Sequence, residues 1–208
     1  ASDVYKRQVY NSFVYDFLYP NPASVLAFIE NHDTDRFLGE GDNLPMLKQA
    51  STLLLTTRRI PQLYYGTEIM MNGVKSKSDG YVRKDFPGGW SGDTETALTA
   101  AGRSKIQNEC YNFYKTLLNW RKGNDVIAKG SMVQFMVQNG VYAYARQYEG
   151  KTVFVMLNGT DAETTVPLKF YKEILKDTKQ GKDILSGKTV AFGESLTMGP
   201  RESLVIEL

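Results

Sequence analysis

A histidine and an aspartate at the end of an apolar segment are the residues best suited to chemistry. His32 and Asp33 directly follow the apolar run at residues 25–29. A carboxylate beside an imidazole suits hydrogen bonding to ligand hydroxyls, or stabilisation of positive charge at a reacting carbon. The alternative is that the pair only hydrogen-bonds its own loop. His32 is the only histidine, which excludes a two-histidine metal site, and no Ser-His-Asp arrangement is suggested.

The surrounding pattern predicts a strand, a helix and a second strand. Residues 25–29 and 60–65 are short apolar runs, typical of parallel strands covered on both faces. Between them, Asn43, Leu44 and Pro45 favour a helix start, and the apolar face continues to the arginines at 58 and 59. Since a βαβ crossover makes its strands parallel, the residues after both runs should lie on one edge of the sheet. The polar residues expected there are Asn31, His32, Asp33, Asp35, Thr67 and Glu68, with Asp79, Arg83 and Asp85 further along the second loop.

The rest of the chain predicts a long helix and then an all-β domain. Residues 106–120 carry an apolar stripe that includes Cys110, which we interpret as a small core residue. Beyond Asp125 the apolar period becomes two, with glycine-containing turns at short intervals, which indicates an antiparallel β-sandwich ending in a strand at residues 204–208. We therefore predict two domains, residues 1–124 and 125–208. Residues 9–18 read as a helix tail, and residues 1–8 as a truncation or joining artefact.

Composition narrows the class of partner. The chain has 208 residues and a formal charge of +2, with 25 basic and 23 acidic residues that form no long runs. Such a balance favours neither nucleic acid nor an anionic membrane as partner, and no segment approaches the ~20 apolar residues that span a bilayer. One cysteine excludes an internal disulfide framework. The predicted partner is a neutral molecule.

Three segments resemble one enzyme family. Residues 28–33, FIENHD, resemble the fourth sequence signature of the alpha-amylase family, glycoside hydrolase family 13. Residues 60–68, IPQLYYGTE, resemble the signature around that family's eighth barrel strand, at the expected separation. Residues 83–90, RKDFPGGW, are similar to the neopullulanase and cyclomaltodextrinase branch. Arg59 departs from the pattern, since the family usually has glycine before Ile-Pro.

The resemblance implies the last part of a (β/α)8 TIM barrel followed by an antiparallel β-sandwich. Members use a retaining mechanism, with an aspartate nucleophile and a glutamate acid/base that would lie upstream of this chain. Asp33 matches the third family carboxylate, the transition-state stabiliser, and His32 matches the histidine that binds sugar hydroxyls at the cleaved subsite. Asp79 and Arg83 resemble a pair that binds the next sugar outward. The alternative for this last pair is a solvated surface ion pair.

The resemblance implies that the substrate is an alpha-1,4-glucan oligosaccharide. It implies no cofactor in this segment. The resemblance is also consistent with calcium in the missing N-terminal part and with dimerisation of the full-length protein. It is consistent with a periplasmic or cytoplasmic location in a bacterium. We expect the full-length protein to be a glycosidase and the isolated chain to show no turnover. Two alternatives stay open: a non-catalytic carbohydrate-binding or structural protein of the same fold, and a transglycosylase of the same family.

Overall fold

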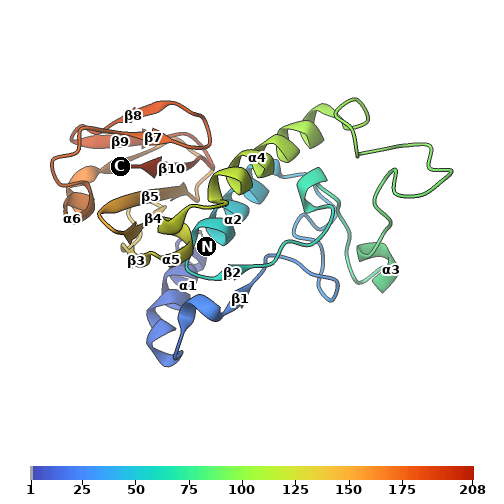
Figure 1. The fold of residues 1–208 in the computed structure, drawn as a ribbon, viewed down its shortest axis with the longest axis horizontal. Coiled ribbons are helices and arrows are strands. Elements are labelled where there is room, and N and C mark those ends of the chain that lie inside the picture. Colours follow the sequence, from blue (N-terminus) through green and yellow to red (C-terminus); the bar gives the residue numbers. More distant parts are fainter. Residues whose placement is uncertain (1) are drawn as a thin grey trace.

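The protein consists of a helix-and-loop part followed by a β domain. In Figure 1 the β domain lies on the left with α1 below it, and the loops around α3 lie on the right. The computed structural model describes the backbone of residues 2–208 and the side chains of residues 8–208. The helices are α1 (Ser2–Val14), α2 (Leu44–Thr56), α3 (Asp79–Val82), α4 (Lys105–Arg121), α5 (Asp125–Lys129) and α6 (Lys172–Leu175), with 3-10 turns at Tyr15–Leu18, Pro22–Ser24, Thr67–Ile69 and Leu168–Tyr171. The strands are β1 (Leu26–Ala27), β2 (Ile60–Pro61), β3 (Ser131–Gln134), β4 (Val141–Tyr148), β5 (Lys151–Asn158), β6 (Thr164–Pro167), β7 (Gln180–Asp183), β8 (Thr189–Ala191), β9 (Ser195–Met198) and β10 (Ser203–Glu207). Within residues 2–208, none of the helices has the length and apolar character that crossing a bilayer requires.

Helix α2 forms where the sequence predicts it and packs against α4. The Asn43 side chain caps it by accepting a hydrogen bond from the Met46 backbone N at 3.0 Å, and a proline occupies the first turn. Its apolar face meets that of α4 in one core cluster, Leu44, Leu47, Leu55, Cys110, Tyr114 and Leu117. Cys110 is fully buried there, which confirms its assignment to the core.

Strands β1 and β2 confirm the predicted parallel pairing but are shorter than expected. They pair with Leu26 opposite Ile60, and α2 connects them. The prediction that both faces of these runs are covered is wrong for the described residues, since Leu26 is 54% and Ile60 is 49% exposed. The physical reason is that Leu26 and Phe28 point to the opposite face from Val25 and Ala27, and no second layer of the described residues packs on that face.

The C-terminal part is the predicted antiparallel β domain. Its main sheet has the order β3-β4-β5-β10-β7-β8, and a second sheet pairs β6 with β9. The main sheet and the second sheet share one apolar core, which includes Ala143, Phe154, Val166 and Met198. Strand β4 is buried on both faces rather than one, because Tyr142 and Tyr144 on its other face pack in a second cluster with α5.

A buried arginine connects the β domain to α2. Arg146, 1% exposed, donates hydrogen bonds to the backbone carbonyls of Thr56, Ile127 and Gly130 at 2.8–2.9 Å. Burial lowers the pKa of Arg146 to about 10, so the guanidinium still carries its charge at neutral pH. The two parts of the chain are thus joined by hydrogen bonds to a charged group, while the division at residue 124 stays a prediction.

The N-terminal helix begins earlier than the sequence suggests, and Arg59 packs against the turn that follows it. Helix α1 includes the backbone from Ser2 onward, so residues 3–8 continue the helix; residue 1 lies outside the described residues. Arg58 and Arg59 both bind the carboxylate of Asp16, which is 5% exposed, and Arg59 also lies over the Phe13 ring at 4.8 Å. Arg59, which departs from the family pattern, therefore ties this turn to the start of β2.

Candidate functional site

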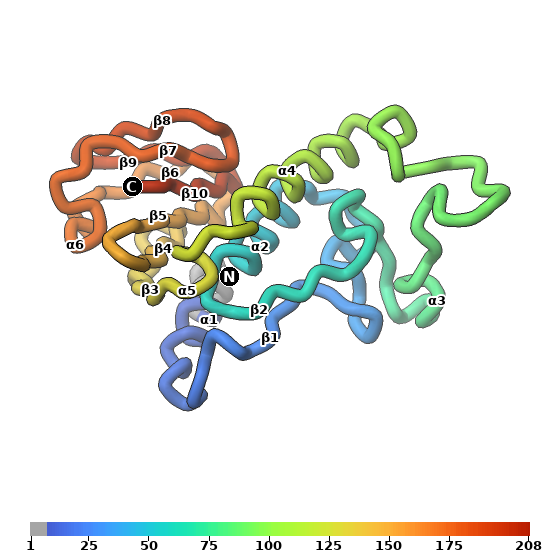
Figure 2. The backbone as a smooth tube through the Cα atoms, in the orientation of Figure 1, coloured from blue at the N-terminus to red at the C-terminus, as the bar shows by residue number. Residues whose placement is uncertain are grey.

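The two loops that carry the candidate residues leave the same edge of the β1–β2 pair. Figure 2 shows the two strands side by side, and the backbone N of Gln62 donates to the carbonyl of Ala27 at 2.8 Å. Beyond the strands, the Thr67 hydroxyl donates to the Glu30 carboxylate. The parallel arrangement therefore brings segments 37 residues apart into contact, as the crossover argument predicts.

A buried ion pair, Glu30 and Arg36, fixes these loops to each other. Both residues are 2% exposed, and Arg36 Nη1 lies 3.3 Å from Glu30 Oε1. Arg36 also donates to the Tyr65 carbonyl at 2.6 Å and to the Val82 carbonyl at 3.0 Å, and its guanidinium lies 4.0 Å from the centre of the Tyr64 ring. One guanidinium thus holds the loop after β1, the loop after β2 and the end of α3.

The sequence analysis did not single out this pair. The only indication of this pair in the sequence is that its two opposite charges lie on either side of the polar turn at residues 31–35. Thr67 was expected among the polar groups at the exposed edge, but it is 3% exposed and lies beneath them with Glu30. The reason is that the short 3-10 turn at Thr67–Ile69 carries its hydroxyl inward.

All four candidate side chains meet at the surface above this pair. Asp33 Oδ2 lies 3.1 Å from His32 Nε2, and Asp33 Oδ1 lies 3.1 Å from Arg83 Nη2. The same Arg83 nitrogen lies 3.3 Å from Asp79 Oδ2, and Arg83 Nε donates to the His32 carbonyl at 3.0 Å. Arg83 is therefore the centre of the cluster, and the Asp79–Arg83 pair contacts the His32–Asp33 segment instead of standing alone.

The turn that presents Asp33 is held by local hydrogen bonds. The Asn31 side chain accepts a hydrogen bond from the Asp33 backbone N at 2.8 Å, and the Thr34 hydroxyl accepts one from the Asn31 backbone N at 3.1 Å. The side chain of Asp33 stays 61% exposed, and that of His32 stays 58% exposed. The carboxylate is thus oriented from both sides and open to a ligand.

Lys75 is a further member of the cluster that the sequence analysis missed. Its Nζ lies 3.4 Å from Asp79 Oδ1 and donates to the Asp33 carbonyl at 3.1 Å, while its backbone N donates to Asp35 Oδ1 at 2.6 Å. The cluster therefore combines two carboxylates, an imidazole and two cations, linked in a chain of ion pairs and hydrogen bonds.

These groups could bind a hydroxylated ligand and place negative charge beside it. Trp90, an aromatic candidate for stacking on a sugar face, is 67% exposed in the loop after α3. In the described part of the chain, no group of three or more histidine, cysteine, aspartate and glutamate side chains is arranged to hold a metal ion.

Comparison with known proteins finds relatives whose descriptions agree with one another. Residues 132–207 match the family described as the Cyclo-malto-dextrinase C-terminal domain. The chain is 30% identical over 174 residues to an alpha-amylase of Niallia circulans, covering 80% of this chain and 30% of that protein. It is 32% identical over 168 residues to a cyclomaltodextrin glucanotransferase of Thermoanaerobacterium thermosulfurigenes, covering 77% of this chain and 21% of that protein. The chain thus spans less than a third of these relatives.

Solved structures share the fold over nearly the whole chain. An alpha-amylase from Geobacillus thermoleovorans, complexed with acarbose, superposes with a TM-score of 0.75 at 23% identity, covering 97% of this chain and 42% of that chain. A gamma-cyclodextrin glucanotransferase from alkalophilic Bacillus clarkii gives a TM-score of 0.73 at 25% identity, covering 97% and 29%. Both the helix-and-loop part and the β domain therefore have counterparts in single known chains.

Proposed function

Because this chain belongs to the alpha-amylase family, glycoside hydrolase family 13, we propose that it carries part of the active site of a retaining alpha-glucan hydrolase. The observation that carries the proposal is the meeting of Asp33, His32, Asp79 and Arg83 at one surface, from loops about fifty residues apart. Surface ion pairs do not require such a meeting, whereas a sugar-binding site does.

Asp33 is proposed to stabilise positive charge on the sugar. Glycoside hydrolysis passes through an oxocarbenium-like transition state, and a carboxylate held beside the ring lowers its energy relative to the bound substrate. His32 and Arg83 each contact one oxygen of this carboxylate, so its orientation is set before substrate binds. The nucleophile and the acid/base are proposed to come from residues outside this chain.

His32, Asp79 and Arg83 are proposed to bind sugar hydroxyls. His32 would contact the sugar at the cleaved bond. Asp79 and Arg83 would contact the next sugar outward, where a carboxylate accepts and a guanidinium donates hydrogen bonds. Since Arg83 contacts both Asp33 and Asp79, binding of the outer sugar and orientation of Asp33 would be coupled.

The β1–β2 pair and α2 are proposed to be the last part of a (β/α)8 barrel. This is supported by the parallel pairing, by the connecting helix, and by the likeness of 97% of the chain to an alpha-amylase chain. Placing the site at the carboxyl ends of these strands fits the position of active sites in such barrels. The exposed faces of Leu26 and Ile60 would then be covered by the remainder of the barrel.

The proposed reaction is hydrolysis of alpha-1,4 links in maltooligosaccharides, cyclodextrins or pullulan. The Cyclo-malto-dextrinase match at residues 132–207 and the segment at 83–90 favour the neopullulanase and cyclomaltodextrinase branch. Transglycosylation is the second candidate, because several relatives are cyclomaltodextrin glucanotransferases.

Product analysis with the full-length gene product tests both reactions. Incubation with maltotriose, and separately with cyclodextrin, should give only shorter linear sugars if hydrolysis dominates. Products longer than maltotriose would instead support transglycosylation. Binding of maltotriose without any product would contradict the enzyme proposal and support the carbohydrate-binding alternative. The isolated 208-residue chain should give no product from either sugar, since it supplies one of the three family carboxylates.

A further inference from the structure

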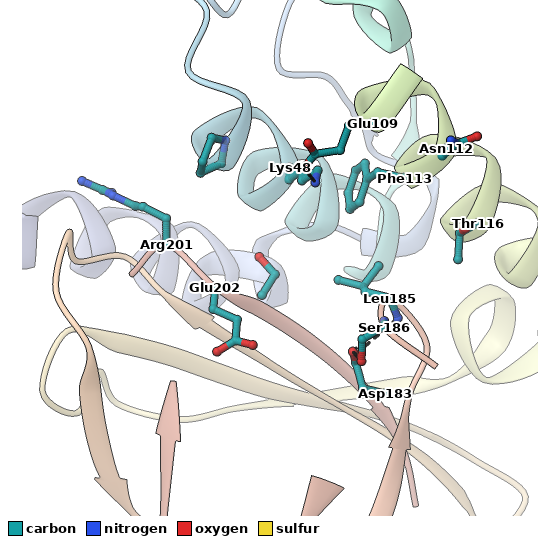
Figure 3. Close-up of a pocket in the computed structure, with 12 residues that line it drawn as sticks. Lys48, Glu109, Asn112, Phe113, Thr116, Asp183, Leu185, Ser186, Arg201 and Glu202 are labelled. Atoms are coloured by element: carbon teal, nitrogen blue, oxygen red, sulfur yellow. Dashed lines mark hydrogen bonds and ion pairs between the residues drawn. The ribbon is translucent and has the colours of Figure 1, made fainter. Parts of the chain in front are cut away.

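Two pockets at the junction between the helices and the β domain differ in charge. The pocket in Figure 3 has both signs, since its lining includes the cations Lys48 and Arg201 and the carboxylates of Glu109, Asp183 and Glu202. A smaller pocket, of about 210 Å³, is lined by four arginines and by apolar residues; the arginines are Arg58, Arg59, Arg121 and Arg146. Among the described residues, no carboxylate lines this second pocket, which we call the arginine pocket.

The arginine pocket lies away from the candidate sugar site. Arg58 and Arg59 follow α2 and directly precede β2, Arg121 is the last residue of α4, and Arg146 lies on β4. The pocket is therefore at the amino end of β2. The cluster around Arg83 is carried by loops that leave the carboxyl ends of β1 and β2, so the two sites are separate.

One carboxylate balances only part of the positive charge of the arginine pocket. Asp16, which is outside the lining, binds both Arg58 and Arg59. Neither Arg121 nor Arg146 pairs with a carboxylate in residues 8–208. Burial, and in the same direction the charges of Arg58 and Arg121, lower the pKa of Arg146, which is the effect of cations held near each other. The four guanidinium groups thus exceed the available carboxylates by three charges.

Helix capping accounts for Arg146 but not for Arg121. The Arg146 guanidinium donates to the carbonyls of Thr56 at the end of α2 and of Ile127 and Gly130 at the end of α5, where a cation is favourable. Arg121 ends α4 and is half-buried, and burial lowers its pKa, yet its nitrogens have no partner within the described side chains. None of these nitrogens is fully buried, so a ligand can reach them. Removing a cation from water without giving it a partner is costly, which indicates a missing anion.

The size and the donors of the arginine pocket fit a small oxyanion. About 210 Å³ is less than the roughly 300–1,000 Å³ of pockets that take larger organic ligands. A guanidinium presents paired, coplanar donors that match the spacing of phosphate oxygens. Arg121 has all its donors available, and Arg58 has a side chain that is 28% exposed and an Nε without a partner. Three uncompensated charges suit a dianion better than a halide.

We propose that the arginine pocket is a binding site for a small divalent oxyanion of the phosphate type. Arg121 binds the anion directly, Arg58 supplies a second guanidinium, and the buried charge of Arg146 favours the anion electrostatically. A bound anion would connect the end of α2, the end of α4 and the β domain, and would stabilise their junction in proportion to its occupancy. This site goes beyond the proposed glucan chemistry and needs no sugar.

Calorimetric titration of the full-length gene product with inorganic phosphate, at a constant ionic strength set with potassium chloride, tests this site. We expect one phosphate per chain, bound about tenfold or more weakly after Arg121→Gln and after Arg58→Gln, because each variant loses a charge-assisted hydrogen bond. Arg121→Gln should fold, since this side chain has no partner to lose, and in Arg58→Gln the Asp16 carboxylate keeps Arg59. Lys122→Gln is the matched control. It removes the same charge one residue further along, from an exposed side chain outside the pocket, and should leave phosphate binding unchanged.

The melting temperature provides a second readout. Phosphate should raise it in the wild type and in Lys122→Gln, and should not raise it in Arg121→Gln. A full-length protein that binds no phosphate would overturn the assignment, as would equal weakening by Arg121→Gln and Lys122→Gln, since that would reflect general surface charge. Hydrolysis assays do not enter this test, so failure of the proposed function and failure of the anion site are distinguishable.

Discussion

Replacing Arg36 by methionine should destabilise the protein strongly and release both loops of the candidate site. Methionine keeps an unbranched side chain but removes the donors that bind Tyr65 O at 2.6 Å, Val82 O at 3.0 Å and Glu30 Oε1 at 3.3 Å. It also leaves the Glu30 carboxylate without its cation at about 2% exposure. Breaking a buried ion pair by removing one partner costs about 3–5 kcal/mol, so we expect a loss of that order.

The assay is urea unfolding of the full-length gene product, followed by circular dichroism, with the Arg36→Met and Glu30→Gln variants and their combination. The double variant should lose less free energy of unfolding than the sum of the losses in the two single variants. Once glutamine replaces Glu30, no buried carboxylate remains for Arg36 to neutralise, so removing Arg36 costs less. Lys129→Met is the control, since it breaks an exposed ion pair with Asp125 and should leave the midpoint unchanged. A loss below about 1 kcal/mol for Arg36→Met, or strict additivity in the double variant, would refute the reasoning.

Three further outcomes follow from other contacts. Burial would raise the pKa of Asp16, but hydrogen bonds from Arg59 and Arg58 outweigh it and hold the pKa below its ordinary value of 3.8. Asp16→Asn should therefore lower the melting temperature above about pH 5, and the difference from the wild type should shrink as the pH falls through 3.8 and below, measured by thermal scans across that range. Burial raises the pKa of the Cys110 thiol to about 12, so a thiol reagent at pH 8 should label it only after denaturation; labelling of the native protein at the rate of free cysteine would contradict its burial. Arg83→Lys should lower kcat/KM for maltotriose about tenfold with the fold intact, because one ammonium cannot reproduce the contacts of the planar guanidinium, and an unchanged value would remove Arg83 from the site.

The elements with strong local signals were predictable from sequence. The Asn43 cap and Pro45 mark the start of α2, and the apolar stripe through Cys110 marks α4. The period of two after Asp125 identifies the β domain, since alternation is required wherever a sheet buries one face. The grouping of His32 and Asp33 with the loop after β2 was also predictable, because it follows from the handedness and parallel pairing of a βαβ unit.

Features that depend on long-range packing were not predictable. The double burial of β4 requires the second cluster around Tyr144 and α5, and alternation alone does not reveal it. The Glu30–Arg36 pair is a contact across a turn whose shape is set by both loops, so charge spacing along the chain gives only a faint signal. The lengths of β1 and β2 depend on how many strands pair with them, which is a property of the sheet and not of the runs themselves.

The most direct test of the account is the turnover of maltotriose by the full-length gene product and its Asp33→Asn variant, with Asp42→Asn as a control at an exposed aspartate nearby in sequence. We expect Asp33→Asn to lower kcat by about 10²–10³-fold or more with an unchanged melting temperature, because the variant loses a charge that interacts mainly with the transition state. The control should retain wild-type kcat. An Asp33→Asn variant with near-normal kcat would contradict the central claim that this carboxylate stabilises the transition state.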